Sequence, residues 1–301
     1  MKSFHFNRRV KFISAFVIGL ILVLGILPVS VGLVLTHPDR IPVVIPASLG
    51  SIKLEPAVFQ SRDSKVKLDG WFLPSKDSNR TVIFAHGYHN NRLQEDVPAI
   101  DIARILNSNS CNVLMFDFRS NGESEGSLTS LGQFEKEDLK GAVDYVKGLG
   151  KPGEHVGVIG FSMGAATALT AAAEDPRIEA VVADSPFADL HAYLEENLPF
   201  WSHLPSFPFT PVILKTLPAI LDLQPETVSP IKALPKIKAP VLLIHGTGDK
   251  HIPVSNSVNL YKASPEGNNL WIVEGAVHVG SYKKQPQQYK QKVLSLFSRM
   301  K

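Results

Sequence analysis

The chain has 301 residues, of which 44% are hydrophobic and 20% charged, so its length and composition suit a globular protein with one sizeable core. Its net charge of +3 comes from the N-terminal flank, because the first 11 residues hold four basic and no acidic residues. The remainder is slightly acidic, which argues against a nucleic acid as partner. A single cysteine, Cys111, excludes an intrachain disulfide, and no Cys/His cluster has zinc spacing, so we expect no metal and no other cofactor.

The first element is an uncharged segment of 25 residues, Phe12 to Thr36, preceded by a basic flank at residues 1–11. A helix of this length measures about 37 Å and can cross a bilayer. The positive-inside rule predicts a cytoplasmic N-terminus and an extracytoplasmic domain after the helix. The apolar region of a cleaved signal peptide is shorter, so we favour a transmembrane signal anchor over 12–36, with secretion after cleavage as the alternative. Four prolines in residues 37–56 predict an extended linker.

Strands and helices alternate from residue 57 to residue 301, the predicted main domain. The predicted strands are 65–73, 81–85, 112–118, 155–159, 178–183, 240–245 and 269–273. The predicted helices are 93–107, 132–148, 165–173, 254–261 and 285–299. The strands are apolar without alternation, which indicates an α/β fold with a mostly parallel sheet of about eight strands, covered by helices on both faces.

The alternation stops between residues 186 and 229, and aromatic residues and prolines are concentrated in the segment 198–209. An apolar insert placed here would lie over the carboxyl edge of the sheet, where ligands bind in open α/β folds. Long inserts are often functional, so we interpret this one as a short lid. The alternative is a packed connector whose aromatic side chains complete the core.

Residues 160–164 read Gly-Phe-Ser-Met-Gly and stand between a predicted strand and a predicted helix. Such a Gly-x-Ser-x-Gly turn is typical of a nucleophile elbow. We expect the two glycines to permit a strained backbone that exposes the Ser162 hydroxyl, and the N–H of Met163 to stabilise developing negative charge. A second match, residues 122–126, lies in a polar segment and carries two carboxylates, so we interpret Ser124 as a loop serine.

A serine nucleophile needs a histidine base and a carboxylate that orients it, in the chain order serine, acid, histidine. His278 follows the last predicted strand and is the preferred base, whereas His245, at a strand end, is interpreted as structural. Asp249 leaves the penultimate strand through a glycine-rich turn and is the preferred acid, with Asp184 as the alternative. The other downstream histidines, in the insert or a surface loop, are His191, His203 and His251.

A second donor to an oxyanion is expected in the loop after the 81–85 strand. Gly87 permits a tight turn there, and we expect the backbone N–H of Tyr88 to face the substrate oxygen. The alternative is that Tyr88 is only a wall of the pocket. His86 is interpreted as a brace for this loop.

Five motifs occur in an order that resembles the α/β-hydrolase superfamily. They are His86-Gly87, the segment Asp117 to Gly126, the elbow around Ser162, the segment Gly246 to Asp249, and the final His278. The resemblance covers about residues 56–301 and is greatest to membrane-anchored serine hydrolases of the Bem46-like type and related bacterial proteins. It implies the α/β-hydrolase fold, and it implies that Asp117 and Arg119 are scaffold residues in a structural turn.

The chemistry expected from these residues is acyl transfer, in which Ser162 attacks a carbonyl, His278 moves the proton and Asp249 orients the imidazole. The anchor and the aromatic insert favour a carboxylic ester or thioester hydrolase for a small-molecule or lipid-like substrate with an apolar acyl chain. The alternatives are a peptidase or amidase, an acyltransferase, and a non-catalytic binding protein on the same scaffold.

Overall fold

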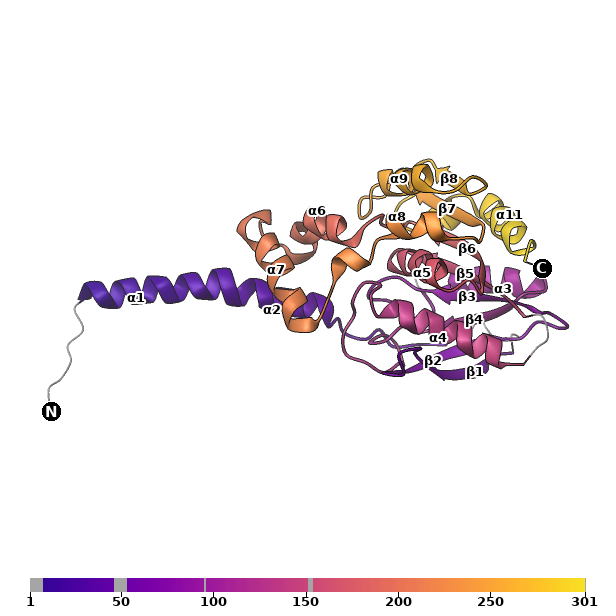
Figure 1. Ribbon diagram of the computed structural model, residues 1–301, viewed down its shortest axis with the longest axis horizontal. Coiled ribbons are helices and arrows are strands. Elements are labelled where there is room, and N and C mark those ends of the chain that lie inside the picture. Colours follow the sequence, from indigo (N-terminus) through magenta and orange to yellow (C-terminus); the bar gives the residue numbers. More distant parts are fainter. Residues whose placement is uncertain (1–7, 46–52, 95, 151–153, 301) are drawn as a thin grey trace. The chain divides into compact units, whose positions relative to one another are not determined.

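The computed structural model describes residues 8–45, 53–94, 96–150 and 154–300 of the chain (Figure 1). These residues divide into two compact units, which are described separately. One unit comprises the N-terminal helix up to His37 together with residues 194–224. The other comprises residues 38–193 and 225–301 and contains the sheet.

The N-terminal helix runs without interruption from Arg8 to Thr36 as α1 (Arg8–Ile21), a π-helical turn η1 (Leu22–Ile26) and α2 (Leu27–Thr36). It has 29 residues with a mean hydropathy of 2.8 in its most apolar window, and it is long and apolar enough to cross a membrane. It begins four residues before the predicted span 12–36, because Arg8, Arg9 and Lys11 add a basic helical turn to the apolar segment.

The insert forms two helices, α6 (Leu190–Ser202) and α7 (Ser206–Leu221), which the sequence pattern does not predict. The prolines in this segment argue against a helix when the sequence is read alone, since a proline in a helix interior removes a backbone hydrogen bond. Pro199 nevertheless lies inside α6, and Pro211 and Pro218 lie inside α7. The interpretation of this segment as a lid stays a prediction.

The second unit is built on an eight-stranded sheet with the order β1-β2-β4-β3-β5-β6-β7-β8 (Figure 1). β2 is antiparallel to both β1 and β4, and all other neighbouring strands are parallel, which confirms the prediction of a mostly parallel sheet of about eight strands. The strands are β1 (Glu55–Gln60), β2 (Lys67–Leu73), β3 (Arg80–Ala85), β4 (Asn112–Phe116), β5 (His155–Phe161), β6 (Ile178–Asp184), β7 (Val241–Gly246) and β8 (Asn269–Val273).

Helices cover both faces of this sheet. The longer ones are α3 (Ala99–Ser108), α4 (Glu135–Gly148), α5 (Met163–Glu174), α9 (Ser255–Ala263) and α11 (Pro286–Phe297). The shorter ones are η3 (Pro225–Thr227), α8 (Pro230–Ala233), η4 (Leu234–Lys236) and α10 (Ser281–Lys284). One buried cluster joins the sheet to α4, α5 and α9, and a second joins it to α3, α10 and α11. Burial on both faces explains why the central strands are apolar without alternation.

Two local differences from the sequence pattern have simple causes. β1, which begins at Glu55 and lies at the sheet edge, is not among the predicted strands because only Ala57 and Phe59 of its six side chains are buried. The helix predicted from residue 93 begins only at Ala99, after Pro98. The residue before a proline disfavours helical φ and ψ angles, so a helix cannot run from residue 93 through Val97 and Pro98.

Candidate active site

Ser162 lies alone between the last residue of β5 and the first residue of α5. Its backbone has φ 54° and ψ −118°, a conformation that is rare for a residue with a side chain and costs about 1–3 kcal/mol. Hydrogen bonds hold it on both sides: its N–H donates to the carbonyl of Asp184 at 2.8 Å, and its carbonyl accepts from Ala165 and Ala166. The turn therefore presents the Ser162 hydroxyl at the carboxyl edge of the sheet.

The two glycines of the elbow flank the strained residue. Neither Gly160 nor Gly164 has a positive φ, and the strained backbone that the sequence predicts at this turn is that of Ser162 itself. They are needed for close packing. A Cβ on Gly160 would lie 2.4 Å from the carbonyl oxygen of Gly164, and one on Gly164 would lie 2.0 Å from that of Ala85. Glycine thus lets α5 start directly against the strand ends.

We expect Gly164→Ala to lower the free energy of unfolding by about 3 kcal/mol or more, because the added methyl group meets backbone that cannot move aside. The measurement is urea unfolding of the detergent-solubilised chain. Gly148→Ala is a suitable control, since Gly148 ends α4 with nothing within 4 Å of an added Cβ, and it is expected to be neutral or slightly stabilising. Equal unfolding midpoints for both variants would contradict the packing argument.

The structure brings together the three side chains predicted as nucleophile, base and acid. His278 Nε2 lies 2.8 Å from Ser162 Oγ, and His278 Nδ1 lies 2.7 Å from Asp249 Oδ2. The carboxylate only accepts hydrogen bonds, so Nδ1 carries the proton and Nε2 is left to accept from the serine hydroxyl. The three residues follow β5, β8 and β7, and the parallel strands place them at one edge of the sheet.

Asp249 is held by donors on both carboxylate oxygens. Oδ1 accepts from the backbone N–H groups of His251 and Ile252, each at 2.9 Å, and Oδ2 lies 2.7 Å from His278 and 3.3 Å from His245 Nε2. Burial of the side chain raises its pKa, but the hydrogen bonds from His245 and His278 outweigh this effect and hold the pKa well below its usual value. Asp249 therefore stays ionised at neutral pH.

His245, interpreted from the sequence as structural, also contacts the carboxylate of Asp249. It is fully buried, and its Nδ1 lies 2.7 Å from Ser257 Oγ, which can donate a proton. Its Nε2 lies 2.8 Å from the carbonyl oxygen of Ile252, so Nε2 carries the proton that also faces Asp249. The sequence holds no signal for this contact, because a spacing of four brings side chains together on a helix, whereas His245 to Asp249 spans a strand end and a turn.

Asp184, the alternative acid, has different surroundings. It is fully buried at the end of β6, and its Oδ1 accepts from Ser185 Oγ at 3.0 Å. Burial raises its pKa from 3.8 to about 6. The described hydrogen bonds of His278 run to Ser162 and Asp249 and not to Asp184, so Asp249 is the better candidate for the acid.

The raised pKa of Asp184 predicts that the wild-type chain loses stability relative to Asp184→Asn as the pH rises. The unfolded chain releases this proton near pH 3.8 and the folded chain near pH 6. The protonated carboxyl therefore stabilises wild type fully below pH 3.8, and this stabilisation decreases as the pH rises from 3.8 to above 6. The full difference is roughly 3 kcal/mol. Thermal unfolding of both proteins in detergent from pH 4 to pH 8 is the measurement, and parallel pH profiles would exclude the shift.

The loop after β3, which contains the second expected oxyanion donor, lies beside Ser162. A Cβ on Gly87 would be 3.5 Å from the Cβ of Ser162. His86 braces the loop as predicted: Nε2 accepts from the N–H of Phe118 at 2.9 Å and Nδ1 donates to the carbonyl of Gly87 at 2.8 Å. The Tyr88 side chain is half-buried, and burial raises its pKa to about 12, so its phenol stays neutral.

The other expected donor, Met163, is the first residue of α5. The first N–H groups of a helix have no carbonyl partner within the helix and face outward along its axis. The positive end of the helix dipole adds to their attraction for an anion. The backbone N–H of Met163, directly after Ser162, is therefore well placed to stabilise negative charge on the oxygen of a carbonyl bound to that serine.

The second Gly-x-Ser-x-Gly sequence forms a structural turn, in agreement with its interpretation. Ser124 is fully buried, its hydroxyl donates to the carbonyl of Asp117 at 2.6 Å, and it accepts from the N–H of Asp69 at 2.9 Å. Asp117 binds the buried guanidinium of Arg92 at 2.6 Å. These contacts make Asp117 part of the scaffold, as the resemblance implies.

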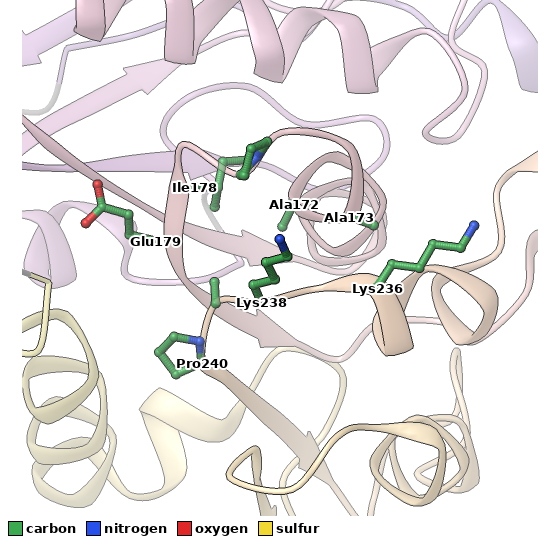
Figure 2. Close-up of a pocket in the computed structure, with 9 residues that line it drawn as sticks. Ala172, Ala173, Ile178, Glu179, Lys236, Lys238 and Pro240 are labelled. Atoms are coloured by element: carbon green, nitrogen blue, oxygen red, sulfur yellow. The ribbon is translucent and has the colours of Figure 1, made fainter.

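A surface pocket of about 410 Å³ lies at the opposite edge of the sheet (Figure 2). Its lining includes Ile178 and Glu179 at the amino end of β6, Pro240 before β7, and the lysines Lys236 and Lys238. Ser162 and its partners lie at the carboxyl ends of the strands, so we do not assign the reaction to this pocket. Among the residues that the structure describes, no group of three His, Cys, Asp or Glu side chains is arranged to hold a metal ion.

Comparisons with known proteins agree with the fold. A family model described as the alpha/beta hydrolase fold matches residues 80–217. The uncharacterized protein YqkD of Bacillus subtilis is 32% identical over 235 residues, which cover 77% of this chain and 76% of that protein. The uncharacterized protein YfhR of Salmonella typhi is 28% identical over 297 residues, covering 92% and 91% of the two chains.

Among solved structures, the Pyrococcus furiosus esterase Pf2001 superposes with a TM-score of 0.73 at 29% identity, over 88% of this chain and 98% of that one. An esterase domain from Rhodothermus marinus superposes with a TM-score of 0.59 at 20% identity, over 83% and 99% of the two chains, a likeness of fold. The sheet order, the family match and these relatives lead to one conclusion. The chain belongs to the α/β hydrolase family.

Proposed function

We propose that the chain is a serine hydrolase that cleaves carboxylic esters or thioesters through an acyl-enzyme intermediate. The main support is the hydrogen-bonded series from Ser162 through His278 to Asp249, with distances of 2.8 and 2.7 Å, at a strained strand-to-helix turn. The ionised state of Asp249 adds to it, because a negative charge beside Nδ1 stabilises the imidazolium that forms when His278 takes a proton.

In the proposed reaction, Ser162 Oγ attacks the carbonyl carbon while its proton passes to His278 Nε2. The N–H groups of Tyr88 and Met163 stabilise the oxyanion that develops. When the tetrahedral intermediate collapses, His278 returns the proton to the leaving alcohol or thiol, and the acyl group remains on Ser162. Water that loses a proton to His278 then attacks the acyl-enzyme. When the second intermediate collapses, His278 returns this proton to Ser162 Oγ and the acid is released, while Asp249 keeps the imidazole in one tautomer.

The chemistry is tested with a fluorophosphonate, which reacts with activated serines, and with p-nitrophenyl esters from acetate to palmitate. The full chain in detergent is expected to be labelled and to hydrolyse the longer esters in preference to acetate, given the aromatic insert at residues 198–209. A folded chain that is neither labelled nor active would favour the non-catalytic binding protein. Activity confined to short, water-soluble esters would contradict an apolar acyl substrate.

We also propose that the helix Arg8–Thr36 is an uncleaved anchor and that the unit with the sheet, residues 38–193 and 225–301, hereafter the hydrolase unit, lies outside the cytoplasm. Its support is the length and hydropathy of the helix and the basic residues Arg8, Arg9 and Lys11 at its start. A charged fluorophosphonate that cannot cross membranes is expected to label the chain in intact spheroplasts, at the size of the full-length protein. Labelling only after lysis would place the unit inside, and a labelled product shortened by about 35 residues would show a cleaved signal sequence.

A further inference from the structure

The insert packs against the second half of the N-terminal helix within one compact unit. Leu198 of α6 and Ile213 and Leu217 of α7 form a buried cluster. Partly buried residues around them include Val29, Leu33 and Leu35 from the N-terminal helix and Leu194, Leu214 and Leu221 from the insert. The insert is therefore joined to the proposed anchor by apolar contacts.

The closest approach of α7 to α2 is at a glycine. Pro28 and Gly32, one helical turn apart, are the buried residues of α2. A Cβ on Gly32 would lie 2.3 Å from Leu217 Cδ1, so glycine lets α7 approach this helix closely. Small residues at a contact between apolar helices are typical of helix packing in membranes.

The contact lies near the end of the helix that is remote from the basic flank. About 20 residues cross the hydrocarbon core of a bilayer, so a span that starts at Phe12 leaves the core near residue 31. Val29, Gly32 and Leu33 then lie at the outer boundary of the core. Between Arg8 and Ile26 the structure describes no buried residue, so this inner part is left to be covered by lipid.

The insert also exposes large apolar side chains. Phe200, Phe207 and Ile220 are 55%, 81% and 58% exposed. Lys215 is the only Asp, Glu, Lys or Arg between residues 197 and 221, and the acidic residues Glu195, Glu196 and Asp222 stand just outside this segment. A lysine can extend its charged end to the membrane surface while its stem stays in lipid.

The two helices are too short to cross a bilayer separately. α6 has 13 residues and α7 has 16, which correspond to about 20 and 24 Å, less than the hydrocarbon core of about 30 Å. The chain bends by 118° between them. This shape suits helices that lie within one interface of the bilayer, where Trp201 is also favourable.

We infer that residues 197–221 are embedded in the outer interface of the bilayer that the N-terminal helix crosses, with Phe200, Phe207 and Ile220 in contact with lipid acyl chains. The inference rests on the anchor in the proposed function and adds a second membrane contact to it. Lipid is the occupant that the contacts favour, because the apolar surface continues directly from a helix that itself needs lipid around it.

The three tryptophans, Trp71, Trp201 and Trp271, allow a direct test with the full chain in phosphatidylcholine vesicles that contain brominated lipid. The variant Trp71→Phe/Trp271→Phe keeps only Trp201, and its emission is expected to fall at least about twofold, more with bromines near the headgroups than near the bilayer centre. The matched variant Trp201→Phe/Trp271→Phe keeps only Trp71, in a strand of the hydrolase unit, and is expected to show little quenching.

A charge on the proposed lipid contact provides a second test. Phe207→Asp in the Trp201-only chain is expected to reduce quenching, because a carboxylate avoids the acyl region. Val58→Asp, at a position on β1 that is 51% exposed, is expected to leave quenching unchanged. Equal effects of the two substitutions would overturn the inference.

Flotation and fluorophosphonate labelling of the same samples separate the inference from the proposed function. If the chain floats with the vesicles and is labelled but Trp201 is not quenched, the inference is wrong and the anchored hydrolase stands. If the chain does not float, the proposed anchor fails and the inference fails with it, whatever the labelling shows. Quenching of Trp201 in a floating chain that is not labelled would support the membrane contact and contradict the hydrolase.

Discussion

Ser162→Ala is expected to abolish fluorophosphonate labelling and to lower kcat for p-nitrophenyl esters by about 10⁶-fold. The substitution removes the oxygen that lies 2.8 Å from His278 Nε2 and leaves the positions of Met163 and the loop of Tyr88 unchanged. Steady-state kinetics and in-gel labelling of the full chain in detergent measure both effects.

Ser124→Ala is the matched control, because Ser124 stands at the centre of the second Gly-x-Ser-x-Gly sequence. Its hydroxyl binds Asp117 and Asp69, so its loss is expected to cost about 1–2 kcal/mol of stability while labelling is retained. If labelling survived in Ser162→Ala and disappeared in the folded Ser124→Ala chain, the nucleophile would have been assigned to the wrong serine.

Asp249→Asn is expected to lower kcat by about 10⁴-fold with little change in KM. All four of its contacts come from groups that donate: two backbone N–H groups to Oδ1, and the rings of His278 and His245 to Oδ2. The NH₂ group of an asparagine at this position would face donors in either orientation, the two backbone N–H groups or the two histidine rings. Facing His278, it would turn that imidazole to the tautomer whose Nε2 carries a proton and cannot accept one from Ser162.

Asp184→Asn is the control for this substitution, because it removes the same charge from the alternative acid. Asp184 bonds the hydroxyl of Ser185, a contact that asparagine can keep, so kcat is expected to change less than about tenfold. Activity measured at several pH values on both variants is the comparison. A larger loss of kcat in Asp184→Asn than in Asp249→Asn would show that Asp184, and not Asp249, is the acid that orients His278.

The strand and helix pattern predicted most of the hydrolase unit because burial on both faces leaves a clear local signal. β8 occurs at its predicted bounds, Asn269–Val273. β5 and β6 end two residues and one residue beyond prediction, and β7 is shifted by one residue. The pattern failed where burial is partial or proline is frequent, as at β1 and in the helices α6 and α7. An edge strand with two buried side chains resembles a linker when it is read as sequence.

The residues of the candidate site could be predicted because they occur in a fixed order along the chain and each follows a strand. Ser162, Asp249 and His278 follow β5, β7 and β8 in the chain, and His278 lies within hydrogen-bond distance of the other two. Their catalytic roles stay a prediction until the variants are measured. The place of His245 beside Asp249 was missed, because a histidine that ends a buried strand has no pattern of its own.

The sequence by itself determined most strands and helices that cover or form the buried sheet, which serine follows a strand directly, and that one apolar helix precedes the hydrolase unit. These are properties of neighbouring residues, expressed as hydrophobic periodicity and as turn chemistry. Only the tertiary structure decided that Ser162 meets a histidine 116 residues away and that the elbow glycines act through close packing beside the strained Ser162. It also decided that α7 lies on α2. Contacts between distant residues depend on how whole elements pack, and no local pattern records that packing.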